Sequence, residues 1–163
     1  MSNDLTLRPI RDSDIDAVRR LQAESFAALA TGDHTPAQIA AHVALIMAPD
    51  YAGELLSNNI LVAEAPGGRL VATAGWCRVP DDDGAARLRK VFVDPALAGQ
   101  GIGRRMVEAA EDSARAAGFR RFRVRSNANA ERFYARLGYR ATGKGDMPAP
   151  GGATLPVVFM AKD

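Results

Sequence analysis

The stretch VDPALAGQGIGRRMVEAA, residues 93–110, has the pattern of a strand end, a glycine-rich bend and the start of a helix. Its alternating glycines, Gly99, Gly101 and Gly103, free the backbone to turn N–H groups inward and let a ligand approach closely. Arg104 and a second arginine follow in the first helical turn, where the partial positive charge of a helix start disfavours bases. A phosphate or diphosphate in the bend would attract both arginines, so the pattern predicts an anion site. A flexible loop with two solvated arginines is the alternative interpretation.

Two familiar nucleotide-binding patterns are absent from this bend. The dinucleotide pattern needs a further glycine three residues after its second one, and Arg104 or Met106 occupies that place. The GK[ST] ending of a nucleoside-triphosphate loop is also missing from the bend.

Length and composition fit a single domain spanning residues 1–163, with 47% hydrophobic and 25% charged residues. A formal net charge of +2 permits an anionic ligand and does not call for a nucleic-acid partner. One cysteine excludes an internal disulfide and a multi-cysteine metal site, and we expect no metal. The amino end lacks a signal-peptide pattern, and the apolar stretches are too short to cross a membrane. We therefore expect a cytoplasmic protein with neither a nucleic-acid nor a membrane partner.

Hydrophobic periodicity and turn residues predict the order of strands and helices. Strands are expected at residues 5–10, 60–64, 70–79, 87–93, 119–125, 139–142 and 155–161. Helices are expected at residues 11–30, 35–48, 101–117 and 128–137. Ser13 and Asp16 are expected to cap the first helix, and Thr35 and Pro36 to begin the second. This order predicts an α/β domain with a mixed sheet and a crossover helix after the fourth strand.

A second motif, NANAERFYARLGY, occupies residues 127–139, after the predicted helix and strand that follow the bend. Together the two motifs resemble the GCN5-related N-acetyltransferases, the GNAT family, over about residues 5–162. The strand, VxP, xxGxG and helix order matches the loop that binds the diphosphate of acetyl-CoA in that family. One position departs from the pattern, because Ala98 stands where the family usually has Gln or Arg.

The resemblance implies a single-domain fold with a mixed, mostly antiparallel sheet flanked by helices and splayed between strands 4 and 5. It implies acetyl-CoA as co-substrate, with the fourth strand pairing with the pantetheine arm and the bend holding the diphosphate. A main-chain N–H near Val91 would polarise the thioester oxygen. The implied acetyl-CoA-binding residues are Val91, Phe92, Val93, Ala98, Gly99, Gln100, Gly101, Ile102, Gly103, Arg104, Asn127, Ala130, Phe133 and Arg136.

Tyr134 falls on the tyrosine that, in the resembled family, protonates the departing CoA thiolate. A phenol with a pKa near ~10 stays neutral at pH 7 and can donate that proton. The alternative is an aromatic side chain that only packs the last helix onto the sheet.

The group that deprotonates the attacking amine is not evident from the sequence. The fourth strand, RLRKVFV, carries no carboxylate, so a water chain is the preferred interpretation. The other candidates are Glu64, His34, His42 and the acidic run 81–83.

In the resembled family the acceptor enters between the first helix link and the last hairpin, here residues 30–38 and 143–156. The acidic run 81–83 suggests a cationic amine, carried by a small molecule or a protein. Dimers are common in the family, so a homodimer is also considered. The leading hypothesis is an acetyl-CoA-dependent N-acetyltransferase that moves the acetyl group directly, without a covalent acyl-enzyme.

Two further hypotheses belong to other functional classes. One is a catalytically silent acyl-CoA-binding regulator on the same fold. The other is a nucleic-acid-binding module that would use Arg121, Arg123 and Arg125, which alternate along one strand. No stacking aromatics lie among these arginines, so a solvated or ion-paired face is the preferred interpretation.

Overall fold

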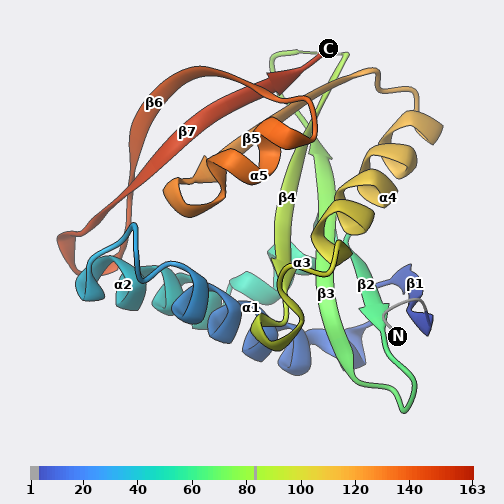
Figure 1. Ribbon diagram of the computed structural model, residues 1–163, viewed down its shortest axis with the longest axis horizontal. Coiled ribbons are helices and arrows are strands. Elements are labelled where there is room, and N and C mark those ends of the chain that lie inside the picture. Colours follow the sequence, from blue (N-terminus) through green and yellow to red (C-terminus); the bar gives the residue numbers. More distant parts are fainter. Residues whose placement is uncertain (1–3, 83) are drawn as a thin grey trace.

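The protein forms a seven-stranded sheet with the order β1-β2-β3-β4-β5-β7-β6 (Figure 1). The structure is a computed structural model that describes residues 4–82 and 84–163. Neighbouring strands are antiparallel except for the parallel pair β4–β5, which confirms a mixed, mostly antiparallel sheet. The strands are β1 (Thr6–Pro9), β2 (Leu61–Glu64), β3 (Leu70–Arg78), β4 (Ala85–Val93), β5 (Arg121–Asn127), β6 (Arg140–Pro148) and β7 (Thr154–Lys162).

Two groups of helices build two separate cores around the sheet. Helices α1 and α2 run together along the lower part of the view in Figure 1, and α4 and α5 lie in its upper part. One core contains α4 and α5, and the other contains residues of α1, α2 and α3. The helices are α1 (Ile15–Leu29), α2 (Pro36–Met47), α3 (Tyr51–Ser57), α4 (Ile102–Ala116) and α5 (Glu131–Arg136).

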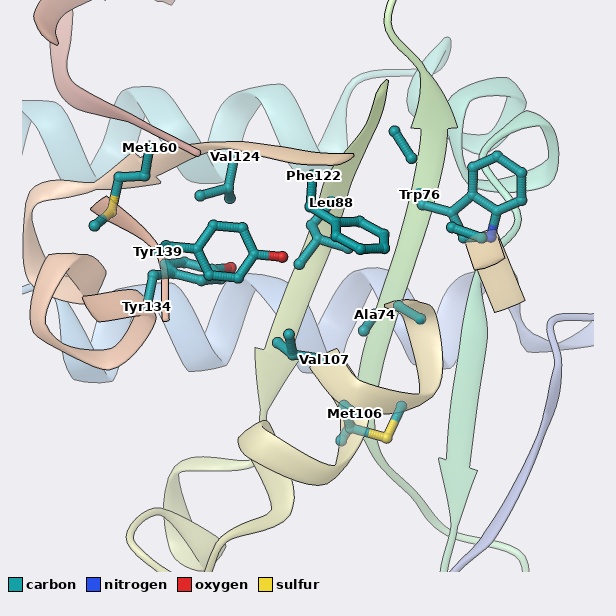
Figure 2. Close-up of a cluster of buried hydrophobic side chains, with 14 of the residues drawn as sticks. Ala74, Trp76, Leu88, Met106, Val107, Phe122, Val124, Tyr134, Tyr139 and Met160 are labelled. Atoms are coloured by element: carbon teal, nitrogen blue, oxygen red, sulfur yellow. The ribbon is translucent and has the colours of Figure 1, made fainter. Parts of the chain in front are cut away.

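The larger core lies between α4 and the middle of the sheet (Figure 2). The face of α4 that carries Met106 and Ala110 at helical spacing is fully buried. It packs in one cluster with Leu88 of β4 and Phe122 and Val124 of β5. Since these side chains point to the α4 face of their strands, their immediate neighbours along β4 and β5 point to the opposite face.

Strands β4 and β5 separate halfway along their length. Their parallel pairing covers Ala85–Leu88 of β4 and ends at the pair Leu88–Val124. Beyond this point β4 continues to Val93 and β5 to Asn127 with no pairing between them. The edge of residues 89–93 that faces β5 is therefore open, as expected for a sheet splayed between strands 4 and 5.

The last hairpin is longer than the sequence predicts. Strand β6 continues to Pro148, whereas the expected strand ends at Thr142 and leaves the next ten residues as a flexible loop. Pairing with β7 holds this segment, in register from Gly143–Phe159 to Pro148–Thr154. Because β6 is an edge strand, a proline at its end removes no internal ladder bond.

Two helical details also differ from expectation. Helix α3 is absent from the expected elements, because its seven residues carry only a short apolar pattern. At the start of α1, Asp14 and not Ser13 organises the first turn, accepting a hydrogen bond of 2.7 Å from the backbone N–H of Arg11. The Asp14 carboxylate is held there by Arg8, with an N–O distance of 2.7 Å. The expected cap of α2 is confirmed, since Thr35 accepts from the Gln38 N–H.

Within residues 4–82 and 84–163, no single helix has the length and apolar character needed to cross a membrane. Only α2 and α3 taken together, with a bend of 70° between them, pass that test by length and composition.

Candidate active site

The glycine bend between β4 and α4 presents a row of unpaired backbone donors. Gly99 and Gly101 adopt left-handed conformations, with φ of 82° and 80°, which side-chain-bearing residues avoid. No described group accepts a hydrogen bond from the N–H groups of residues 99–104. Asp94 fixes the entry to the bend by accepting from the Ala96 N–H at 2.9 Å, and Arg69 pairs with the same carboxylate. Free donors at a helix start are the groups that an anion site requires, and the anion site itself stays a prediction.

The two arginines after the bend are engaged elsewhere. Arg104 forms an ion pair with Glu108 one turn along the helix, with an N–O distance of 2.9 Å. Arg105 donates to the carbonyl oxygen of Leu5 at 3.2 Å. The expectation that both guanidinium groups attract an anion in the bend stays a prediction, and the groups that face the bend itself are its main-chain donors.

Gly103 allows α5 and the end of β4 to approach the first turn of α4. A Cβ atom at this position would lie 3.0 Å from Cε1 of Phe133 and 3.5 Å from Cγ2 of Val93. Phe133 and Val93 therefore pack against the start of α4, and neither lines the main cavity.

A cavity of about 420 Å³ opens where β4 and β5 separate. Five of the predicted site residues line it together: Val91 and Phe92 from β4, Asn127 from the end of β5, and Ala130 and Tyr134 beyond it. The cavity also reaches α2, α3 and the β6–β7 hairpin on the opposite face of the sheet. It therefore passes through the splay and joins the two faces.

A second cavity of about 460 Å³ lies between α4 and α5. Arg104 and Arg136 both line it, so the structure brings together two predicted residues at the surface beside the bend.

Tyr134 is the buried phenol at the centre of the main cavity wall. Its ring packs edge-on against that of Tyr139, with the centroids 5.7 Å apart (Figure 2). The Phe133 ring also meets it edge-on, with the centroids 5.0 Å apart. Its hydroxyl has no hydrogen-bond partner among the described residues. Burial raises the pKa of Tyr134 well above its ordinary value, so the phenol keeps its proton at neutral pH.

A family model for the acetyltransferase (GNAT) domain matches residues 57–141, which contain β4, the bend and Tyr134. The chain belongs to the GNAT family. No curated protein matches it. Three solved structures illustrate the shared fold.

The first is a GCN5-related N-acetyltransferase from Rhodopseudomonas palustris, with 24% identity, a TM-score of 0.85, and coverage of 97% of this chain and 94% of that one. The second is the PaiA N-acetyltransferase from Thermoplasma acidophilum in complex with coenzyme A, with 16% identity, a TM-score of 0.77 and 98% coverage of both chains. The third is YncA of Salmonella typhimurium with acetyl-CoA, with 23% identity, a TM-score of 0.65, and coverage of 98% and 93%.

In this GNAT-family chain, a β-bulge shapes the open end of β4. The register with β3 shifts between Thr73 and Gly75, and Lys90 takes a left-handed φ of 59°. The hydroxyl of Thr73 donates to the Lys90 carbonyl at 2.6 Å and accepts from Nε2 of Gln22 at 3.0 Å. The Tyr51 hydroxyl donates in turn to Oε1 of Gln22. This buried chain of hydrogen bonds runs from α3 through α1 and β3 to the bulge.

Sequence reasoning misses this network, although two of its members leave a signal. Gln22 and Thr73 are both fully buried. Thr73 is a polar residue within an apolar strand, and Gln22 lies four residues from Val18 and from Phe26, on the apolar face of α1. A buried polar side chain requires a hydrogen-bond partner.

The Lys90 side chain lies in the cavity on the face of α3. Its ammonium group lies 2.9 Å from Oε2 of Glu54 and 4.3 Å from the centre of the Tyr51 ring. Burial lowers the pKa of Lys90, and the hydrogen bond to Glu54 opposes that effect.

Among the proposed proton acceptors that the structure describes, His42 alone lines the cavity. Its ring stacks on Phe26 with a centroid distance of 3.8 Å. Burial, helped by the nearby charges of Lys90 and His34, lowers the pKa of His42 to about 4. The imidazole is therefore neutral at pH 7.

The other candidate bases lie away from the cavity. Glu64, on β2, forms an ion pair with Arg8 of the edge strand β1, with an N–O distance of 2.7 Å. Asp82 pairs with arginines of β5 at the closed end of the β4–β5 pair, and Asp83 lies outside the described residues. His34 is buried, its two ring nitrogens unpartnered, and does not line the cavity.

The far face of the cavity corresponds only in part to the expected acceptor entrance. The β6–β7 hairpin contributes as expected, through Met147, Pro148 and Leu155. Residues 30–38 do not line the cavity, and α2 and α3 take their place. The amide of Gln38 instead donates to the Thr154 carbonyl at 3.1 Å and joins α2 to the hairpin.

Proposed function

We propose that this GNAT-family protein is an N-acetyltransferase that moves the acetyl group of acetyl-CoA directly to an amine of a small molecule or protein. The observation that carries the proposal is the splay itself. The open edge of β4 runs from the free donors of the bend to a cavity where a buried, protonated Tyr134 meets a second entrance.

The residues present fit acetyl-CoA along this path. The N–H groups of residues 99–104 suit its diphosphate. The unpaired edge of residues 89–93 and the side chain of Asn127 suit the amides of its pantetheine arm. Arg136 is assigned to the 3′-phosphate only by the sequence motif, because Glu108, Glu111 and Asp112 also line the cavity that it shares with Arg104. The solved structures with coenzyme A from Thermoplasma acidophilum and with acetyl-CoA from Salmonella typhimurium share this fold and support the proposal.

The thioester of acetyl-CoA supplies the activated acetyl group. The backbone N–H of Val91, which follows the bulge at Lys90, is placed to donate to the thioester oxygen as negative charge develops there. The Tyr134 phenol holds the proton that the departing sulfur receives.

The amine loses its proton to water in this proposal. The strand that faces the cavity carries no carboxylate, and a His42 pKa of about 4 makes that imidazole a weak acceptor for an ammonium of pKa ~10.4. A water chain through the cavity to solvent is therefore assigned the task.

The experiment is a panel of amines assayed for CoA release from acetyl-CoA, with amino acids, aminophosphonates, polyamines, aminoglycosides and peptides as acceptors. We expect turnover with at least one class and a higher melting temperature with acetyl-CoA. Binding of CoA with no turnover of any amine would favour the silent acyl-CoA-binding regulator. Absence of binding would contradict both functions.

A further inference from the structure

The alternating arginines of β5 do not share one environment. Arg121 pairs with Asp82, and Arg123 lies 2.7 Å from Asp163 and 3.7 Å from Asp82. Arg121 and Arg123 therefore form an ion-paired face, the interpretation that sequence analysis prefers to a nucleic-acid-binding face. Arg125 has no hydrogen-bond or ion-pair partner among the described residues, and it lines the main cavity.

Arg87 lies across the strand pair from these residues. It is half-buried, lines the cavity, and has no hydrogen-bond or ion-pair partner in the part of the chain that the structure describes. In the parallel register it sits opposite Arg123, one residue before the last pair, Leu88–Val124. Arg125 follows that last pair by one residue. Because Leu88 and Val124 point to the α4 core, both arginines lie on the opposite face, at the base of the splay.

The acceptor half of the cavity carries an excess of positive charge. Its acidic residues are Asp50 and Glu54, and Glu54 is bonded to Lys90. Burial lowers the pKa of Arg87, and the charges of Arg125 and Arg89 lower it further. Arg87 is half-buried and Arg125 is exposed, and an anion between them would offset both the desolvation of Arg87 and the repulsion between the two cations. The cationic lining consists of Arg87, Arg89, Lys90 and Arg125.

We infer that the acceptor is an amine that also carries a carboxylate, phosphonate or phosphate group, and that Arg87 and Arg125 bind this anionic group at the base of the splay. The inference rests on the proposed acetyl transfer and names its substrate class. Guanidinium groups present paired donors that match such anions, and a charge-assisted bond discriminates strongly against an uncharged analogue. Polyamines and other purely cationic acceptors would meet like charge here. The acidic run 81–83 does not oppose this assignment, because Asp81 and Asp82 do not line the cavity.

The test compares acceptors that differ by one negative charge. Glycine, methionine and glutamate are each assayed against the α-carboxamide, and aminomethylphosphonate against methylamine, with spermidine as the polycation. We expect kcat/KM to be about 10- to 100-fold higher for the anionic member of the preferred pair. Equal or better rates with the uncharged members or with spermidine would overturn the inference and leave acetyl transfer standing.

Two variants locate the effect. Arg87→Met and Arg125→Met should each lower the anionic-to-neutral ratio about tenfold, mainly through a higher KM for the anionic amine. Arg123→Met is the matched control, because it lies on the same strand and face but is satisfied by acids outside the cavity. An equal loss of the ratio in the control would contradict the assignment to Arg87 and Arg125.

A binding readout separates this inference from the proposed function. The melting temperature of the protein with saturating CoA is measured with and without the anionic amine. A rise that Arg87→Met removes supports the anion site even where no amine is acetylated. No rise with any anionic amine overturns it.

Discussion

The β4–β5 splay has two halves, which offer a ligand different kinds of groups. The half on the side of α4 and α5 offers main-chain groups: the open edge of β4 along the cavity and, beyond the end of that strand, the donors of residues 99–104. The half that faces α2 and α3 offers side chains, several of them charged, from elements far apart in sequence. Main-chain recognition constrains glycine positions and spacing, whereas side-chain recognition is free to change residue by residue. One half is thereby suited to a fixed ligand and the other to a ligand that varies between proteins of this fold.

Tyr134 stands where the two halves meet, and its loss is expected to have the largest effect. Tyr134→Phe should lower kcat by about 100-fold or more while leaving the Kd for acetyl-CoA within about twofold, because only the phenol proton is removed. Steady-state kinetics and calorimetry measure the two quantities. Tyr139→Phe is the control, since its hydroxyl donates to the buried Glu111 and does not line the cavity. It should lose stability and retain kcat, and an equal kcat loss in both variants would count against Tyr134 as the acid.

A side chain placed in the bend tests the main-chain half alone. Gly101→Trp should abolish the rise in melting temperature caused by acetyl-CoA, which at 100 times the Kd corresponds to about 2.7 kcal/mol. Gly118→Trp is the matched control, because Gly118 also has a left-handed φ and open space around its Cβ, but lies at the far end of α4. It should show the same backbone strain and keep the acetyl-CoA shift. A shift that survives in Gly101→Trp would remove the bend from the binding site.

The buried network tests whether the two halves are independent. Thr73→Val removes the hydroxyl that bridges Gln22 and the Lys90 carbonyl, leaving both groups buried without that partner. Unfolding free energy from urea titration should fall by about 1–3 kcal/mol, and kcat should fall as the bulge relaxes. Thr142→Val, at an exposed hydroxyl on β6, should change stability by less than about 0.5 kcal/mol. Unchanged stability in Thr73→Val would show that the bulge does not depend on the hydroxyl of Thr73.

The smallest expected effect is a pH dependence from His42. Its pKa is about 4 in the folded chain and near ~6.5 when unfolded, so between these values the unfolded state binds a proton that the native state does not. Stability therefore falls as the pH falls, by about 1 kcal/mol from pH 6.5 to 5.5. The low pKa of His42 results from burial and from the nearby charges of Lys90 and His34. Urea titrations at the two pH values should show this loss in the parent protein and a smaller loss in His42→Phe. Equal losses would show that His42 is not the titrating group.

The difference between the two halves also explains what the sequence could predict. Two motifs contain the bend, Asn127, Ala130 and Tyr134, and the spacing within the motifs fixes the relative positions of these residues. In the structure, Asn127, Ala130 and Tyr134 line one cavity. Arg87 and Arg125 belong to no local pattern. Their meeting depends on the register of β4 with β5 and on the point where that pairing ends, and neither is encoded within a short stretch.

The elements that sequence reasoning missed have a similar cause. Strand β6 contains two glycines and a proline that argue against a strand, yet pairing with β7 overrides this propensity. The ring of Phe159 covers Gly145, whose Cβ would lie 3.0 Å from that ring. Helix α3 has one buried face of two residues, Tyr51 and Leu55, too short for periodicity to distinguish it from a loop. In both cases, contacts with distant parts of the chain determine the secondary structure.

The contact between Gly103 and the Phe133 ring has a mechanical consequence. Phe133 immediately precedes Tyr134, and Gly103 lies in the first turn of the helix that opens with the anion-binding donors. A displacement of that turn would therefore press on the Phe133 ring, which contacts the ring of Tyr134 edge-on. Under the proposed function, the diphosphate in the bend would thus help to align the phenol that acts at the other end of acetyl-CoA.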